Sequence, residues 1–263
     1  MPYEYIVAEQ RGRVGIVTFN KPDRLNVFGD AMFGEVRQAI ETFNNDPGVG
    51  AVVLTGSGRA FCAGADIRRW DENIQAQERG EQRQRQREDE NWVHFIQRSK
   101  PIVCAINGLS IGVGLTMTLP CDVRIASDQA RLSMRFVRVG VLPELASTRL
   151  LGHIVGLTHA LELMLSGRII DAPEAVRIGL VNRVVPHDEL LDHAVETAAE
   201  IAFNPSESLT AIKRMAWAHL AETSLEEVLK REDGEFAAAT ERPAFKEAVK
   251  AFLEKRQPDF HRG

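Results

Sequence analysis

The chain carries two stretches of the same design, AVVLTGSGRAFCAGAD at residues 51–66 and IVCAINGLSIGVG at residues 102–114. Each begins with apolar, β-prone residues and ends in glycines that lead into a helical pattern. The first N–H groups of a helix have no intrahelical acceptor, and the helix dipole adds partial positive charge there. Two such strand-to-helix junctions that converge would form an oxyanion hole, which stabilises a thioester enolate or a tetrahedral adduct.

The rest of the first half alternates between strand and helix patterns. Residues 13–19 and 122–126 read as strands, residues 28–43 have helical periodicity, and residues 68–98 predict a polar, solvated helix. Strands separated by helical crossovers pair in parallel, so the predicted fold class is α/β.

From Pro143 onward the pattern is mostly helical, apart from a strand predicted at 180–185. Four helical stretches follow, at residues 187–203, 206–221, 225–239 and 244–255. We place a boundary at Asn204-Pro205, between an α/β core of residues 1–203 and a C-terminal helical, oligomerisation region of residues 204–263. The apolar stripe on the last helix predicts packing either on its own core or on a neighbouring subunit, and both remain open.

Composition excludes several classes of partner. The 263-residue chain has a formal net charge of −5, which argues against nucleic acid or an anionic membrane. We see no signal peptide and no apolar run near the roughly 20 residues of a membrane span. The three cysteines fit neither a disulfide framework nor a zinc site, and the histidines lack metal-ligand spacing, so we predict a cytoplasmic protein without a metal. Dinucleotide and P-loop fingerprints are also missing, which implies neither NAD nor ATP.

A set of motifs in one order resembles the crotonase, or enoyl-CoA hydratase/isomerase, superfamily over nearly the whole chain. The motifs are Leu25-Asn26-Val27-Phe28, the two junctions, Cys121-Asp122, the segment 140–143 before a Ser147-Thr148 helix, residues 179–182 and residues 252–256. The resemblance implies a spiral of ββα units with a C-terminal helical region, assembled as trimers or dimers of trimers. It also implies an acyl-CoA thioester as ligand, with coenzyme A as part of the substrate and no separate cofactor.

The resemblance also implies roles for particular residues. The thioester oxygen would accept hydrogen bonds from the N–H groups of Ala65 and Val113. Coenzyme A would contact a further set of side chains and backbone positions, namely Arg24, Leu25, Ala63, Asp66, Ile67, Phe252 and Lys255.

The chain departs from the pattern of hydratases, which use two glutamates to hold and activate water. The resemblance puts Thr116 and Phe136 at those two positions, and neither side chain is a base near neutral pH. One acid, Glu144, follows Pro143 at the position that carries the carboxylate in double-bond isomerases of the family. The alternative is that Glu144 only helps to start a helix. Pro143 would then be the first helical residue, and the Glu144 carboxylate would stabilise the positive end of the helix dipole.

We therefore expect an enzyme that shifts a double bond in an enoyl-CoA, with Glu144 as acid and base. The alternatives are a hydratase, an acyl-CoA thioester hydrolase and a non-catalytic acyl-CoA-binding homologue.

Cys62 lies inside the first junction, where its thiol could be either reactive or a packing group. Of these two interpretations we favour packing.

Overall fold

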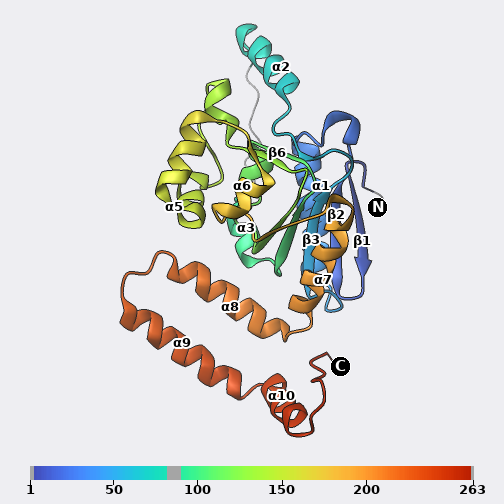
Figure 1. Cartoon of the computed structure of the whole chain (residues 1–263), viewed down its shortest axis with the longest axis vertical. Coiled ribbons are helices and arrows are strands. Elements are labelled where there is room, and N and C mark those ends of the chain that lie inside the picture. Colours follow the sequence, from blue (N-terminus) through green and yellow to red (C-terminus); the bar gives the residue numbers. More distant parts are fainter. Residues whose placement is uncertain (1–2, 82–89, 262–263) are drawn as a thin grey trace.

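The computed structural model describes residues 3–81 and 90–261, except for the side chain of Asp30. Its larger sheet has six strands in the order β1-β2-β3-β5-β7-β10 (Figure 1). The pair β1-β2 is antiparallel and the other four pairs are parallel. The strand bounds are β1 Ile6–Arg11, β2 Val14–Phe19, β3 Ala51–Gly56, β5 Ile102–Ile106, β7 Val123–Ser127 and β10 Arg183–Val185.

A smaller sheet has four short strands in the order β4-β6-β8-β9. They are β4 Ala60–Cys62, β6 Leu109–Ile111, β8 Arg131–Ser133 and β9 Ile170–Asp171, of which only the pair β8-β9 is antiparallel. Strands β3, β5 and β7 of the large sheet are each followed by a short strand of the small sheet. This repeat of a long strand, a short strand and a helix is the expected spiral of ββα units.

Helices cover both faces of the large sheet. Helix α7 (Leu190–Ala202) packs its small and apolar residues on one face, where alternate strand residues such as Ile16 and Val53 meet it. On the other face, α1 (Asp30–Asn45), α3 (Trp92–Arg98) and the small sheet enclose a larger apolar core. The period-2 alternation of each strand supplies both cores at once.

The remaining helices surround these two sheets. They are α2 (Ile67–Glu78), α4 (Val113–Thr116), α5 (Ser147–Ser166) and α6 (Ala172–Arg177), with 3₁₀ turns η1 (Pro22–Arg24), η2 (Arg135–Val139) and η3 (His187–Glu189). Helix α2 projects from one end of the molecule (Figure 1).

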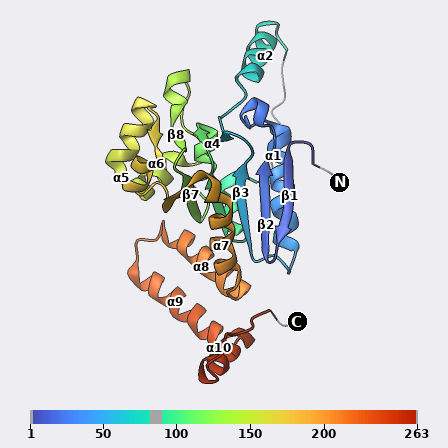
Figure 2. The same cartoon turned by 45° about the vertical axis from the view of Figure 1, so that its right-hand side comes forward.

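The C-terminal helices α8 (Ser206–His219), α9 (Leu225–Thr240) and α10 (Pro243–Leu253) extend to the other end (Figures 1 and 2). An ion pair of 2.7 Å between the buried Lys213 Nζ and the partly exposed Asp122 Oδ2 fastens α8 to the core. Several large apolar side chains of α9 and α10 are exposed in the single chain, including Phe236 and Phe252. The boundary at Asn204-Pro205 falls between α7 and α8, and the division into a core and an oligomerisation region stays a prediction.

The structure confirms the predicted α/β class and the four C-terminal helices, but it corrects the helix expected at residues 68–98. Helix α2 ends at Glu78 and α3 begins only at Trp92, where the Asn91 side chain accepts a hydrogen bond from the Val93 N–H. Part of the predicted helix, residues 82–89, lies outside the described residues.

Candidate active site

The two glycine-marked junctions lie against each other. Strands β4 and β6 pair in parallel, with Cys62 opposite Ser110. A methyl group on Gly64 would come within 3.0 Å of the Ile111 carbonyl oxygen, and one on Gly114 within 2.1 Å of the Cys62 carbonyl oxygen. Close backbone approach therefore requires glycine at position 114, whereas at position 64 the φ of 103° requires it and the close contact adds to that.

The two backbone donors predicted for an oxyanion hole, the N–H groups of Ala65 and Val113, lie at these two contacting junctions. Gly112 has a φ of 56° and precedes α4, so that Val113 is the first residue of that helix. Ala65 forms an isolated bridge with Phe28, whose N–H donates to the Gly64 carbonyl at 2.8 Å. Within residues 3–81 and 90–261, no hydrogen bond from the N–H of Ala65 or Val113 is formed, and both residues are half-buried. Both N–H groups are thus available to a ligand at the edge of the core.

The first five residues predicted to contact coenzyme A come together beside the first junction. The Arg24 guanidinium pairs with the Asp66 carboxylate at 2.7 Å, and the Ala63 N–H donates to the Leu25 carbonyl at 3.0 Å. Asp66 also caps α2 through the Arg68 N–H, and Ile67 begins that helix with an exposed side chain. The Arg24–Asp66 pair is partly exposed, so its effect on stability is small, and it orients Arg24 beside the junction.

Asn26 holds this loop in place, although the sequence motif gave it no role. Its fully buried side chain accepts a hydrogen bond from the Lys21 N–H and donates to the carbonyls of Ser57 and Ala60. Its backbone is left-handed, with a φ of 51°. An asparagine inside the Leu25–Phe28 motif was the available signal, because asparagine tolerates this conformation and bonds to nearby backbone.

The last two predicted coenzyme A contacts are not brought to this cluster within the single chain. Phe252 lies on α10 and Lys255 two residues beyond that helix, at the end of the molecule opposite α2 (Figures 1 and 2). Both are exposed. The sequence predicted that both residues contact coenzyme A. Within the single chain, however, they lie far from Arg24 and Asp66.

Thr116 and Phe136, which stand where hydratases carry glutamates, both lie at the second junction. Thr116 is fully buried on α4, with its hydroxyl 3.5 Å from the Val113 carbonyl oxygen. Phe136 is 7% exposed, and its ring would lie 3.9 Å from a methyl group on Gly112. These two positions therefore supply a buried hydroxyl and an aromatic ring instead of carboxylates.

Glu144 lies in the loop between η2 and α5, and its side chain is exposed. Helix α5 begins at Ser147, so the alternative that Pro143-Glu144 starts a helix is wrong. The two residues after Glu144, Leu145 and Ala146, have left-handed backbones with φ of 56° and 54°. Leu142 is 85% exposed and does not bury the carboxylate in the single chain.

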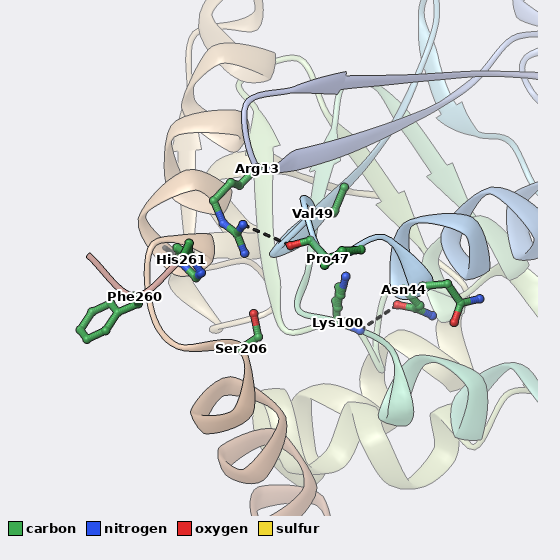
Figure 3. Close-up of a pocket in the computed structure, with 9 residues that line it drawn as sticks. Arg13, Asn44, Pro47, Val49, Lys100, Ser206, Phe260 and His261 are labelled. Atoms are coloured by element: carbon green, nitrogen blue, oxygen red, sulfur yellow. Dashed lines mark hydrogen bonds between the residues drawn. The ribbon is translucent and has the colours of Figure 1, made fainter. Parts of the chain in front are cut away.

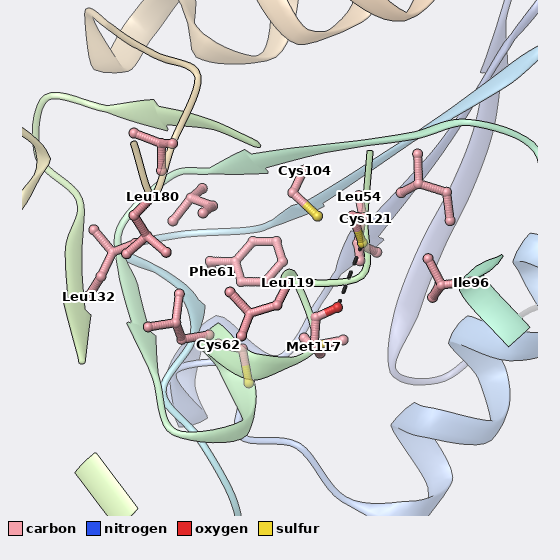
Figure 4. Packing of buried hydrophobic residues seen from close by; sticks show 14 of the residues in the cluster. Leu54, Phe61, Cys62, Ile96, Cys104, Met117, Leu119, Cys121, Leu132 and Leu180 are labelled. Atoms are coloured by element: carbon pink, nitrogen blue, oxygen red, sulfur yellow. Dashed lines mark hydrogen bonds between the residues drawn. The ribbon is translucent and has the colours of Figure 1, made fainter. Parts of the chain in front are cut away.

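Cys62 is a packing residue. Its thiol is fully buried and donates a weak hydrogen bond to the Gly64 carbonyl at 3.9 Å, pointing away from Phe61 and Leu119 (Figure 4), and burial raises its pKa to about 12. A thiol with that pKa is almost wholly protonated at neutral pH and is a poor nucleophile.

The described part of the chain holds neither a metal-binding cluster nor a membrane-spanning helix. No three His, Cys, Asp or Glu side chains there are grouped so as to hold a metal ion. No helix there has the length and apolar character needed to span a membrane.

Comparison with known proteins identifies the family. A profile of the enoyl-CoA hydratase/isomerase family matches residues 9–263. A probable enoyl-CoA hydratase of Mycobacterium bovis is 36% identical over 99% of both chains. The mitochondrial enoyl-CoA hydratase of Pongo abelii is 34% identical over 98% of this chain and 88% of that protein. A crystal structure of a probable enoyl-CoA hydratase/isomerase from Mycobacterium abscessus superposes with a TM-score of 0.83, at 30% identity and 98% coverage of both chains.

The chain belongs to the enoyl-CoA hydratase/isomerase family and has the crotonase fold. The family predicted from the motifs is thereby confirmed. The relatives cited by sequence are named as hydratases, whereas the positions of Thr116 and Phe136 carry no carboxylate.

Proposed function

We propose that this enzyme moves the double bond of an enoyl-CoA through an enolate held by the N–H groups of Ala65 and Val113. The observation that carries the proposal is the direct contact of the two junctions, which leaves both N–H groups without a partner in the described residues. Preorganised donors of this kind stabilise negative charge as it develops on a thioester oxygen.

In this reaction Glu144 is the single acid and base. Its carboxylate removes a proton from C2 of a 3-enoyl thioester, and the electron pair moves onto the thioester oxygen as a dienolate. The carboxylic acid then returns the proton at C4, which leaves the double bond between C2 and C3. The missing carboxylates at Thr116 and Phe136 favour this route, because isomerisation requires one base whereas hydration also requires a held and activated water.

The exposure of Glu144 in the single chain implies that a further surface covers the site during catalysis. Apolar side chains beside it are also exposed, with Val139 at 49%, Val141 at 38% and Leu142 at 85%. We propose that a neighbouring subunit of a homotrimer, or a dimer of trimers, covers this loop, and that the exposed Phe252 and Lys255 reach a coenzyme A from such an assembly.

The test is to measure each possible product from 2-enoyl-, 3-enoyl- and saturated acyl-CoA. The wild type should convert 3-enoyl- to 2-enoyl-CoA, and Glu144→Gln should lower kcat by about 10²–10⁴-fold while coenzyme A still binds. Glu200→Gln, an exposed glutamate on α7, is the matched control and should keep full activity. Wild-type turnover in Glu144→Gln would refute the role of Glu144.

A second candidate function is hydration of 2-enoyl-CoA, which the names of the relatives favour. Its product is 3-hydroxyacyl-CoA, whereas thioester hydrolysis would release free coenzyme A. Saturable binding of all three substrates without any product would instead identify a non-catalytic acyl-CoA-binding homologue.

A further inference from the structure

A pocket lies at the other end of β2 from the proposed active site. It has a volume of about 520 Å³ and lies between the β1–β2 turn, the end of α1 with the α1–β3 connection, the start of α8 and the C-terminal tail (Figure 3). Nine residues line it: Arg13, Asn44, Asn45, Pro47, Val49, Lys100, Ser206, Phe260 and His261.

The lining of this pocket is basic. Arg13 and Lys100 carry positive charge, His261 adds an imidazole, and none of the nine lining residues is acidic. This contrasts with the whole chain, whose formal net charge is −5. Ser206 adds a hydroxyl, whereas the Asn44 amide already donates to Glu41 and Ser99, so the donors of the pocket are mainly those of Arg13, Lys100 and Ser206.

Arg13 and Lys100 are fixed by carbonyl groups rather than by carboxylates. Arg13 donates from Nε to the Ala202 carbonyl and from Nη1 to the Pro47 carbonyl, both at 3.2 Å. Lys100 Nζ donates to the carbonyls of Phe43 at 2.8 Å and Asp46 at 2.6 Å. A guanidinium has five N–H donors and an ammonium three, so both cations keep donors that these bonds do not use.

The electrostatics of Lys100 also suit an anion. Burial lowers its pKa, Asp46 raises it and Arg13 lowers it further. The Asp46 carboxylate accepts a hydrogen bond from the Gly48 N–H and does not line the pocket. An anion beside Lys100 and Arg13 would therefore offset the cost of holding two cations together in a partly buried place.

We propose that this pocket binds the phosphate group of a small molecule, with Arg13 and Lys100 as its principal ligands. A guanidinium offers a planar, bidentate fit to phosphate, and such charge-assisted hydrogen bonds are among the strongest in proteins. The pocket is also larger than a single phosphate ion, and Phe260, whose ring stacks edge-on against Phe203 at 5.8 Å, offers an aromatic surface beside it. Inorganic phosphate and a nucleoside monophosphate are the two sources of this chemistry.

This site is separate from the coenzyme A cluster. Arg13 immediately precedes β2, whereas Arg24 follows the end of β2 by five residues, so the whole length of the strand lies between them. The proposal therefore stands independently of the proposed function.

The test is calorimetric titration of the full chain with inorganic phosphate and, separately, with AMP. Arg13→Gln should weaken binding about 10- to 100-fold, the expected effect of losing a charged hydrogen-bond donor. Arg11→Gln, an exposed arginine on β1, is the matched control and should bind as the wild type does. Arg24→Gln should leave the Arg13-dependent part of the binding unchanged, which separates this pocket from phosphate held at the coenzyme A cluster.

Tighter binding of AMP than of phosphate would assign the pocket to nucleotides, and equal affinity would assign it to phosphate alone. The absence of saturable binding of both, or equal affinities in wild type and Arg13→Gln, would overturn the proposal. If Arg13→Gln does not fold, Arg13→Lys decides, because it keeps the charge but loses the bidentate geometry; an unchanged Kd in that variant would equally overturn it.

Discussion

Replacing Gly114 by alanine should disable the enzyme by forcing the two junctions apart. The new methyl group would lie 2.1 Å from the Cys62 carbonyl oxygen and 2.9 Å from both the carbonyl carbon and the Cβ of that residue. Two of these three atoms are backbone, so no side-chain rotation relieves the contact. The β4 and α4 segments must move apart by roughly 1 Å to reach ordinary van der Waals distance.

This displacement sets the size of both the loss of stability and the loss of activity. Overpacking of a tight core costs about 1–3 kcal/mol, and a backbone obstacle belongs at the upper end of that range. The better helix propensity of alanine returns about 1 kcal/mol, which leaves a destabilisation of about 2 kcal/mol. Misplacing a catalytic group by about 1 Å, or losing one oxyanion donor, lowers kcat by about 10²-fold or more.

The assay should follow conversion of 3-enoyl-CoA together with deuterium incorporation at C2, because that exchange reports the enolate directly. Urea denaturation gives the free energy of unfolding, and it shows whether the variant is folded under assay conditions. Gly152→Ala on α5 is the control, since no atom lies within 4 Å of its new methyl group. A folded Gly114→Ala variant with wild-type exchange and turnover would refute the convergence of the junctions on the reacting thioester.

Three further predictions concern residues away from the junctions. Lys213→Met should lower the free energy of unfolding by about 1.5–3 kcal/mol, measured by urea denaturation, because it removes the charged hydrogen bond from the buried Lys213 to Asp122. The hydrogen bond from Arg256 lowers the pKa of Glu247 to about 2, below its unfolded value, so the stabilisation is complete above about pH 4.5 and is lost as pH falls towards 2. The stability difference between wild type and Glu247→Gln should therefore shrink over that interval. A thiol reagent at pH 8 should leave Cys62 unmodified in the native protein and modify it in urea, because burial raises its pKa to about 12.

The first two of these predictions have matched controls. Lys250→Met removes an exposed lysine that lies 4.0 Å from Glu254, and it should change stability by less than about 1 kcal/mol. The stability difference between wild type and Glu200→Gln should not shrink from pH 5 to pH 2 in the way that the difference for Glu247→Gln does. Rapid native modification of Cys62 would contradict its packing role and would reopen the reactive-thiol alternative.

The sequence predicted those long elements well whose apolar residues show a clear period, whereas the polar stretch 68–98 shows none and was wrongly predicted as one helix. Residues 28–43 repeat apolar side chains at helical spacing, and α1 spans Asp30–Asn45. The three-residue strands β4, β6 and β8 were not predicted as separate strands, because three residues are too few to show a period-2 pattern. These short strands build the small sheet that brings the two junctions together, so the decisive contact depends on pairing between distant segments.

The site could be predicted only where the backbone supplies the chemistry. Glycines at 64 and 114 imply close backbone approach, and the structure places both backbones in contact. The surroundings of Glu144 could not be predicted, because its loop has no periodicity and its exposure depends on side chains from other segments. Phe252 and Lys255 lie on and just beyond α10, at the end of the single chain opposite α2, and no local pattern in the sequence shows this separation from Arg24 and Asp66.

Backbone strain gives an independent reason to connect the loop at Leu25-Asn26 with the loop that carries Glu144. Five residues other than glycine have left-handed backbones in the described chain: Leu25, Asn26, Leu145, Ala146 and Lys255. Two of them, Leu25 and Lys255, are coenzyme A contacts that the family resemblance implies. Asn26 holds the loop that contains Leu25. The other two, Leu145 and Ala146, directly follow Glu144. Lys255 has a local explanation, since a left-handed residue commonly ends a helix such as α10. The consecutive pair Leu145-Ala146 has no such explanation, and each of its residues costs about 1–2 kcal/mol. Strain of that size persists only where the surrounding structure imposes it, and it gathers at functional sites, which favours a positioned rather than an incidental carboxylate at Glu144.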